Sequence, residues 1–179
     1  MSGGAGGARA RGVFVLRFLL LFAGLATLGF WLGVPQRYGE VLRVAGSLTC
    51  PLLNGWTLER RAAAADGLQQ VWFRRGNDQL RLAIGLEQMA LSLLPLLALL
   101  GATPGLGPAG VAARAAIGVA ALFLLDLLVI WLFPWLVGSP GPTTDILGTF
   151  LGLLTFVGGP VILWFALTYD RLRDVWRLS

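Results

Sequence analysis

Four long runs of apolar residues constrain the fold of this chain more than any other feature. They cover residues 13–34, 82–100, 115–137 and 146–167, about half of the sequence. An α-helix rises 1.5 Å per residue, so a run of about twenty residues matches a bilayer hydrocarbon core of about 30 Å. The sequence therefore predicts an all-α membrane protein, a four-span transmembrane helical bundle whose main solvent is lipid.

The composition supports this class and excludes several kinds of site. The chain is 56% hydrophobic with a mean hydropathy of +0.76, and its 179 residues leave no room for a separate globular enzyme domain. Histidine, the commonest general base and metal ligand, is absent. The single cysteine, Cys50, can form neither an internal disulfide nor a multi-thiolate metal site. We therefore assign no catalytic residue, no cofactor and no metal.

The net charge of +5 points to membrane headgroups rather than to nucleic acid. The arginines flank the apolar runs, where basic residues set orientation, and they form no stripe with interleaved aromatics. Arginine is densest in the two tails and is absent from residues 138–145. The positive-inside rule then predicts a multi-pass plasma-membrane protein with both termini cytoplasmic. Residues 101–114 would be a cytoplasmic loop, and residues 35–81 and 138–145 would lie outside.

The two tails are expected to contribute little to the fold. Residues 1–12 are rich in glycine and alanine and carry two arginines, a composition that favours disorder. Residues 168–179 alternate arginine with aspartate and predict a frayed helical extension in the cytoplasm.

The first loop begins with a segment whose apolar residues recur at helical spacing after Pro35. This pattern predicts a short amphipathic helix in the membrane interface, with Arg37, Glu40 and Arg43 on its polar face. Pro51 and the Asn54-Gly55 pair are expected to end it. Its predicted apolar face consists of Tyr38, Val41, Leu42, Ala45, Leu48 and Leu52.

The rest of the first loop predicts a small antiparallel β segment. Residues 56–84 contain short apolar stretches separated by turn signals at 65–67 and 76–78. We expect two or three strands, the last running directly into the second apolar run. So small a sheet needs the interfacial helix or a partner to cover it.

Two carboxylates form a candidate intramembrane polar site. Asp126 lies at the centre of the third run, where a carboxylate is costly and needs a partner. It is either an ion, proton or partner site, or a protonated acid bonded to Thr155 or Thr149. Glu87 lies nearer the outer surface and either snorkels to the interface or pairs with an arginine such as Arg81. Their unequal depths argue against direct contact.

Four arginines on the predicted hairpin form a candidate partner-binding set: Arg60, Arg61, Arg74 and Arg75. They are either solvated surface charges or a site for an acidic peptide or lipid headgroups. Pro95 and the Gly-Gly-Pro step at 158–160 are read as helix kinks and close packing sites, with a broken helix lining a substrate site as the alternative.

The order of these parts resembles a known family. The resemblance is carried by Arg17-Phe18-Leu19-Leu20-Leu21 in the first run, the β segment leading into Leu91-Ser92-Leu93-Leu94-Pro95, and Gly159-Pro160-Val161-Ile162-Leu163-Trp164 before a short tail. In these features the chain is similar to the small membrane proteins associated with exosortase H, a bacterial protein-sorting system. The resemblance implies a non-catalytic accessory protein of the inner membrane, whose partner is a membrane sorting protease or another inner-membrane protein.

A looser resemblance to exosortases themselves fails at their catalytic residues. Those enzymes use a cysteine, an arginine and a histidine, whereas here histidine is absent and Cys50 lies in the first loop. Glu87 stands roughly where the cysteine would be expected, so no catalytic role is carried over. Two other functions stay open: a small transporter or channel subunit using Asp126 and Glu87, and a carboxylate-based membrane enzyme.

Overall fold

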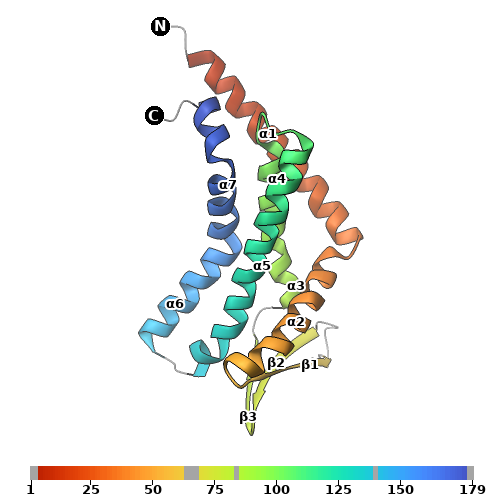
Figure 1. Ribbon diagram of the computed structural model, residues 1–179, viewed down its shortest axis with the longest axis vertical. Helices are drawn as coiled ribbons and strands as arrows, with labels where there is room; N and C mark the ends of the chain where they lie inside the picture. Colours follow the sequence, from red (N-terminus) through yellow and green to blue (C-terminus); the bar gives the residue numbers. More distant parts are fainter. Residues whose placement is uncertain (1–3, 63–68, 83–84, 139–140, 177–179) are drawn as a thin grey trace.

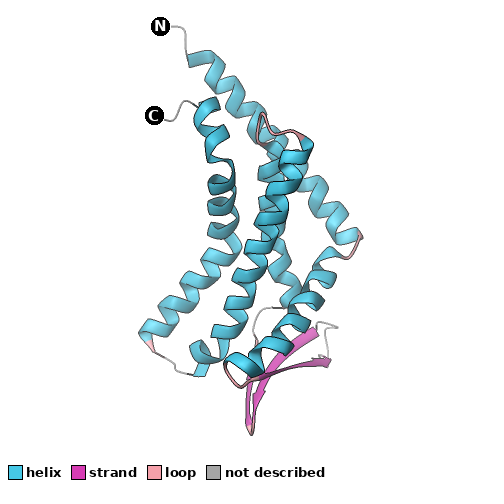
Figure 2. Cartoon of the chain, viewed as in Figure 1, coloured by secondary structure: helices cyan, strands magenta, loops and turns pink. Residues whose placement is uncertain are grey.

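The computed structural model describes residues 4–62, 69–82, 85–138 and 141–176. The chain is mostly helical, and a small sheet is confined to the end opposite the two termini (Figures 1 and 2). The elements in chain order are α1 (Gly4–Trp31), α2 (Val34–Leu53), β1 (Thr57–Ala62), β2 (Gln69–Arg75), β3 (Asp78–Arg81), α3 (Leu86–Met89), the 3₁₀ turn η1 (Ala90–Ser92), α4 (Leu93–Ala102), α5 (Pro108–Gly138), α6 (Pro142–Leu153), the π turn η2 (Leu154–Gly158) and α7 (Gly159–Trp176).

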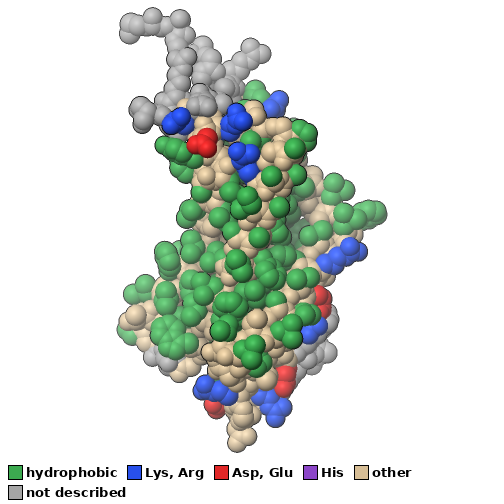
Figure 3. All heavy atoms as spheres, viewed as in Figure 1, with side chains coloured by type: hydrophobic (Ala, Val, Ile, Leu, Met, Phe, Trp, Pro, Cys, Tyr) green, Lys and Arg blue, Asp and Glu red, His purple; other side chains and the backbone are tan. Residues whose placement is uncertain are grey.

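Three helical segments of the described chain are long and apolar enough to cross a membrane: Gly12–Trp31, Pro108–Gly138 and Pro142–Arg173. A shorter apolar helix covers Leu86–Ala102. Hydrophobic side chains cover the middle of the face shown in Figure 3, whereas arginines and acids gather mainly towards its two ends. Length, composition and this charge distribution together indicate a membrane protein.

The second apolar run is shorter as a helix than the predicted 82–100. Its first residues belong to the sheet: β3 ends at Arg81, and the Leu82 amide still donates to the Val71 carbonyl at 3.0 Å. Helix begins only at Leu86, after Gly85 in an extended conformation. Leu82 is therefore paired in the sheet, although hydropathy alone assigns it to the second span.

This shorter helix is the best-covered apolar element of the bundle. Leu96 and Leu100 are fully buried, and α4 packs against α1, α5 and α7. Gly118 of α5 makes this approach possible, because a Cβ there would lie 2.8 Å from Leu96 Cδ2. The shortest apolar helix therefore has much of its surface covered by the longer ones.

Several helix ends extend beyond the predicted runs. α1 begins at Gly4, inside the segment expected to be disordered, and α7 continues to Trp176, in agreement with the predicted helical extension of the tail. α5 begins at Pro108 rather than at residue 115, and it includes Arg114. A helix satisfies its own backbone hydrogen bonds, so it can continue past the apolar run that anchors it.

α2 packs through a face that differs from the predicted one. Its buried positions are lined mainly by small residues, whereas Val41, Leu48 and Leu52 of the expected apolar face are exposed. A Cβ at Gly39 would lie 2.9 Å from the Glu87 amide nitrogen, so only glycine permits this approach to α3. The buried face consists of Pro35, Gly39, Leu42, Gly46 and Cys50.

The predicted antiparallel β segment is confirmed, with three strands in the order β1-β2-β3. Leu58, Phe73 and Leu80 occupy one line across the strands on the face turned towards the helices. Gly76, with φ of 60°, and Asn77 form the tight turn between β2 and β3. The other predicted turn, at 65–67, lies outside the described residues.

The fourth apolar run is one long helix with an irregular turn at its centre. The π turn η2 precedes Gly159 and Pro160, where the sequence predicts a kink or a close packing site. A Cβ at Gly159 would lie 2.6 Å from the Leu154 carbonyl oxygen, so this turn requires glycine. Pro95 lies in the first turn of α4, directly after the 3₁₀ turn η1. The 3₁₀ turn η1 and the π turn η2 are each a single turn that departs from α-helical winding, and helix continues on both sides of each.

Candidate functional site

Asp126 is fully buried near the middle of α5, and its partner is a tyrosine of α2. The Tyr38 hydroxyl donates to Asp126 Oδ2 at 2.6 Å. The Tyr38 ring lies edge-on to Phe123, one turn earlier on α5, with centroids 6.0 Å apart. The carboxylate at the centre of the third apolar run is thus enclosed by α2, an element that the sequence assigns to the interface.

The hydroxyl partners predicted for Asp126 are not the ones it uses. Thr149 is exposed, and the buried Thr155 hydroxyl has no hydrogen-bond partner among the described residues. The second oxygen of Asp126, Oδ1, also has none within the described part of the chain. A buried polar atom in this state costs about 1–3 kcal/mol. Asp126 is therefore half satisfied, by a single strong contact.

Two further polar contacts join α2 to α5 towards the sheet. Trp131 Nε1 donates to Thr49 Oγ1 at 2.8 Å, and Asn54 Nδ2 donates to the Trp131 carbonyl at 2.9 Å. The Asn54 side chain also accepts from the Trp56 amide at 3.1 Å. Sequence reasoning missed Tyr38, Thr49 and Asn54 as site residues, although a polar residue on the buried side of a helix near an intramembrane acid is a usable signal.

Glu87 lies beside the N-terminal part of α2, close to Tyr38, but it does not pair with Asp126. Gly39 packs on the Glu87 backbone, while the neighbouring Tyr38 reaches Asp126. The Glu87 carboxylate folds back over Gly85, with Oε1 3.2 Å from where a Cβ would stand. Among the described residues Glu87 forms no ion pair, so the predicted pairing with Arg81 is not made there. Nor does any hydrogen bond join Glu87 to Asp126 in this part of the chain.

Of the four hairpin arginines, Arg74 and Arg75 have described side chains, and these two make separate contacts. Arg74 makes an ion pair with Glu59 at 3.5 Å on the outer face of the sheet. Arg75 stacks on Trp56, with its guanidinium carbon 4.7 Å from the ring centroid. The strand register places Arg60 opposite Val71 and Arg61 opposite Gln70, several pairs along the strands from Arg74 and Arg75; their side chains lie outside the described part.

Cys50 is buried against the sheet and lacks the features of a nucleophile. Burial raises the pKa of its thiol to about 11, so the thiolate is scarce at neutral pH. Within the described ranges no three His, Cys, Asp or Glu side chains are grouped to hold a metal. The hydrogen bonds of Tyr38, Thr49 and Asn54 form a polar seam that joins α2 and its C-cap residue to α5.

Comparison with known proteins gives no match to a family model, a curated protein or a solved structure.

Proposed function

We propose that this chain is a non-catalytic integral membrane accessory protein of a bacterial exosortase-type protein-sorting system. It would lie in the inner membrane with both termini cytoplasmic and act through helix and hairpin contacts with a membrane sorting protease. The choice of sorting system rests on the resemblance of its apolar segments to the small membrane proteins associated with exosortase H. The geometry of α2, α5 and the sheet supports a binding role.

Four crossings fit the arrangement of the helices in this proposal. In Figure 1, α1 begins and α7 ends at the same end of the molecule, which is the arrangement that an even number of passes would give. The helix Leu86–Ala102 has 17 residues and a length of about 25 Å, at the short limit for a span. Packing against α1, α5 and α7 would cover its ends with protein and keep their polar backbone groups away from lipid hydrocarbon.

The observation that carries the proposal is the close packing of the sheet on the bundle. Phe73 is fully buried and stacks on Phe133 of α5, with ring centroids 5.3 Å apart. Leu58 packs over Gly46 of α2, where a Cβ would lie 3.2 Å from Leu58 Cδ2. The outer face, with Thr57 and Arg74, stays exposed. A sheet held in this way presents its outer face and its β1 edge to a partner.

Site-specific photocrosslinking tests this role. A photoreactive side chain at Thr57, on the outer face of β1, should capture one membrane partner that also co-purifies in mild detergent. The same group at Leu153, an exposed residue of α6, serves as the control and should capture only lipid or nothing specific. A clean monomer with no adduct at Thr57 would contradict the proposal. Reporters at the two termini test the orientation, and activity on the extracytoplasmic side would invert it.

The unsatisfied oxygen of Asp126 favours one second candidate, a transporter or channel subunit. In that case Asp126 would bind a proton or cation in transit, with Glu87 nearer the surface. Full burial of Asp126 and its bond to Tyr38 leave it without an open path in this conformation. Flux through reconstituted vesicles decides between the two: a transporter should lose its flux in Asp126→Asn, whereas an accessory protein should give the same background flux with and without the substitution.

A further inference from the structure

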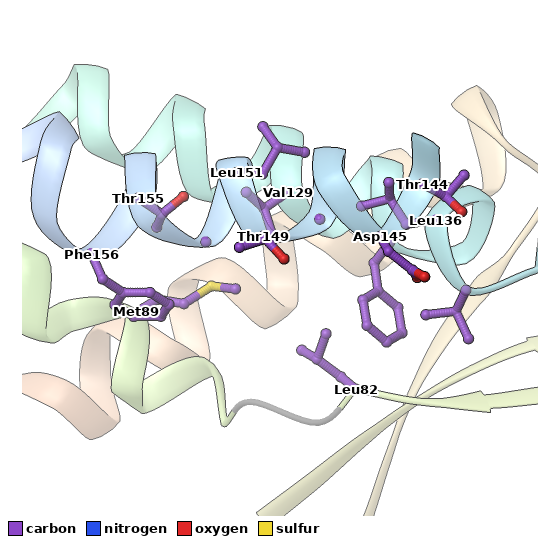
Figure 4. Close-up of a pocket in the computed structure, with 14 residues that line it drawn as sticks. Leu82, Met89, Val129, Leu136, Thr144, Asp145, Thr149, Leu151, Thr155 and Phe156 are labelled. Carbon is purple, nitrogen blue, oxygen red and sulfur yellow. The ribbon is translucent and has the colours of Figure 1, made fainter. Parts of the chain in front are cut away.

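A cleft of about 350 Å³ opens beside α6 at the sheet end of the molecule (Figure 4). α6 and η2 form one wall, Leu82 and Met89 form the other, and Val129 and Phe133 of α5 belong to its lining. Neither the hydrogen-bonded residues between α2 and α5, such as Tyr38 and Asp126, nor the outer face of the sheet lines this cleft. The cleft is therefore separate from the surfaces used in the proposed function.

Two glycines of α6, Gly148 and Gly152, leave the floor of the cleft open. A Cβ at Gly148 or Gly152 would meet nothing within 4 Å, whereas one at Gly39 would meet the α3 backbone at 2.9 Å and one at Gly118 would meet Leu96 at 2.8 Å. Gly39 and Gly118 thus receive a neighbouring element, whereas Gly148 and Gly152 line the cleft and leave a channel unfilled.

The dimensions of the channel suit one alkyl chain. A helix of about 10 Å diameter occupies on the order of 420 Å³ per turn, more than the cleft of about 350 Å³, so a slender chain suits the cleft better than another helix. Along α6 the cleft runs from Asp145 to Thr155, about 15 Å at the helical rise, which is half of a hydrocarbon core of about 30 Å. That is the depth of a single lipid leaflet.

Charge at the mouth indicates the headgroup. Asp145, in the first turn of α6, is the one charged residue among the described residues lining the cleft, and it makes no ion pair with another described residue. It lies at the end of α6 near the sheet, where headgroups would be (Figures 1 and 4). Thr155 closes the deep end at 1% exposure, so its hydroxyl is beneath the surface and no ligand contact is assigned to it.

We propose that this cleft is a lipid site that takes one acyl chain along Gly148 and Gly152 and the ammonium of the headgroup at Asp145. A phospholipid with an ammonium headgroup fits the negative mouth, whereas a headgroup with only negative charge would be repelled by it. The glycines let the chain lie against the α6 backbone, in contact with Val129 and Phe133.

Lipid retention measured by native mass spectrometry tests the site. The full chain is reconstituted with equal amounts of phosphatidylethanolamine and phosphatidylglycerol carrying identical acyl chains, and is then released from mild detergent. The unchanged protein should keep one phosphatidylethanolamine at least fivefold more often than phosphatidylglycerol. Equal retention of the two lipids, or none of either, would overturn the proposal.

Matched variants separate the chain contact from the headgroup contact. Gly152→Leu fills the channel and should lower retention at least fivefold, whereas Gly24→Leu, at an equally open glycine of α1, should not change it. Asp145→Asn should remove the headgroup preference, and Asp145→Glu should keep it, although both keep a polar residue in the first turn. If Gly152→Leu does not fold, Gly148→Leu replaces it. Retention unchanged in the folded filling variant, or a preference kept by Asp145→Asn, would refute the site.

Discussion

Two consecutive helices, α1 and α2, are attached to the bundle in different ways. α2, together with its C-cap residue Asn54, meets α5 through three side-chain hydrogen bonds, and it meets α3 at Gly39 with almost no space. α1 contacts α4 through Gly29 and Leu21, and its Phe14 ring stacks on Trp164 at 5.8 Å. No side-chain hydrogen bond from the described side chains of α1 reaches another helix.

The difference shows what can fix a helix when the solvent is lipid. Lipid tails are as apolar as leucine, so apolar contact alone gives little drive for association, and close packing and polar bonds decide it. α2 has both, and it carries the sheet. α1 has long apolar side chains exposed on most of its surface. Substitutions should therefore damage α2 far more than α1, and four predictions test this contrast.

The largest loss is expected for Gly39→Leu. Its Cβ would lie 2.9 Å from the Glu87 amide nitrogen, and backbone cannot move aside as a side chain can. We expect a loss of about 3 kcal/mol in the free energy of unfolding, the upper part of the range for overpacking. Reversible unfolding in mixed detergent micelles, followed by circular dichroism, measures it. Gly24→Leu on α1 is the control, and equal losses at the two sites would remove the contrast.

Next in size is the contact between Tyr38 and Asp126. Tyr38→Phe leaves the Asp126 carboxyl without the partner that it has among the described residues, and Asp126→Leu leaves the Tyr38 hydroxyl without its acceptor. Each single change should cost about 2 kcal/mol. The double variant should cost less than the sum by about 1–2 kcal/mol, because no buried group is then orphaned. Strict additivity in the same unfolding assay would show that the bond contributes nothing.

A smaller effect is expected for Trp131→Phe. The change removes the donor to Thr49 Oγ1 and keeps an aromatic ring, while the Trp131 carbonyl still accepts from Asn54. Hydrogen bonds between membrane helices contribute about 0.6 kcal/mol on average, so we expect a loss of about 0.5–1 kcal/mol. Thr49→Val should give a similar value, and the two changes together should give little more.

The smallest effect is expected for Leu20→Ala on α1. Leu20 is 66% exposed, and in a bilayer its side chain exchanges lipid contact for lipid contact. The free energy of unfolding should change by less than about 0.5 kcal/mol. A loss of 2 kcal/mol would mean that this face of α1 is covered, and Leu20 would then mark an interface with another protein.

The coarse fold could be predicted because each of its signals is local. Runs of twenty apolar residues indicate spans, and alternation with a Gly76-Asn77 turn indicates a hairpin. The exact start of the second helix could not be predicted, because Leu82 fits a span and a strand equally well by hydropathy. Its hydrogen bond to Val71 is what makes it part of the sheet.

The polar seam was harder to predict, for reasons that α2 makes clear. Hydropathy ranks leucine above glycine, so Leu48 and Leu52 look like the inner face and Gly39 and Gly46 do not. In lipid the leucines lose nothing by facing outward, and the glycines gain by admitting a neighbour. Asp126 was identifiable as a residue in need of a partner, but Tyr38 lies 88 positions away, and no local pattern joins them.

The π turn η2 in the fourth apolar helix sets how α7 is rotated about the helix axis relative to α6. Beyond it, Trp164, Thr168 and Leu172 recur every four residues on the buried side of α7, and Trp164 Nε1 donates to Thr103 Oγ1 at 2.9 Å. Each residue turns an α-helix by about 100°, so deleting one residue here would swing this stripe out of alignment while leaving α6 as it is. The wide π turn therefore keeps the buried stripe of α7 facing its neighbours while α6 keeps its own orientation.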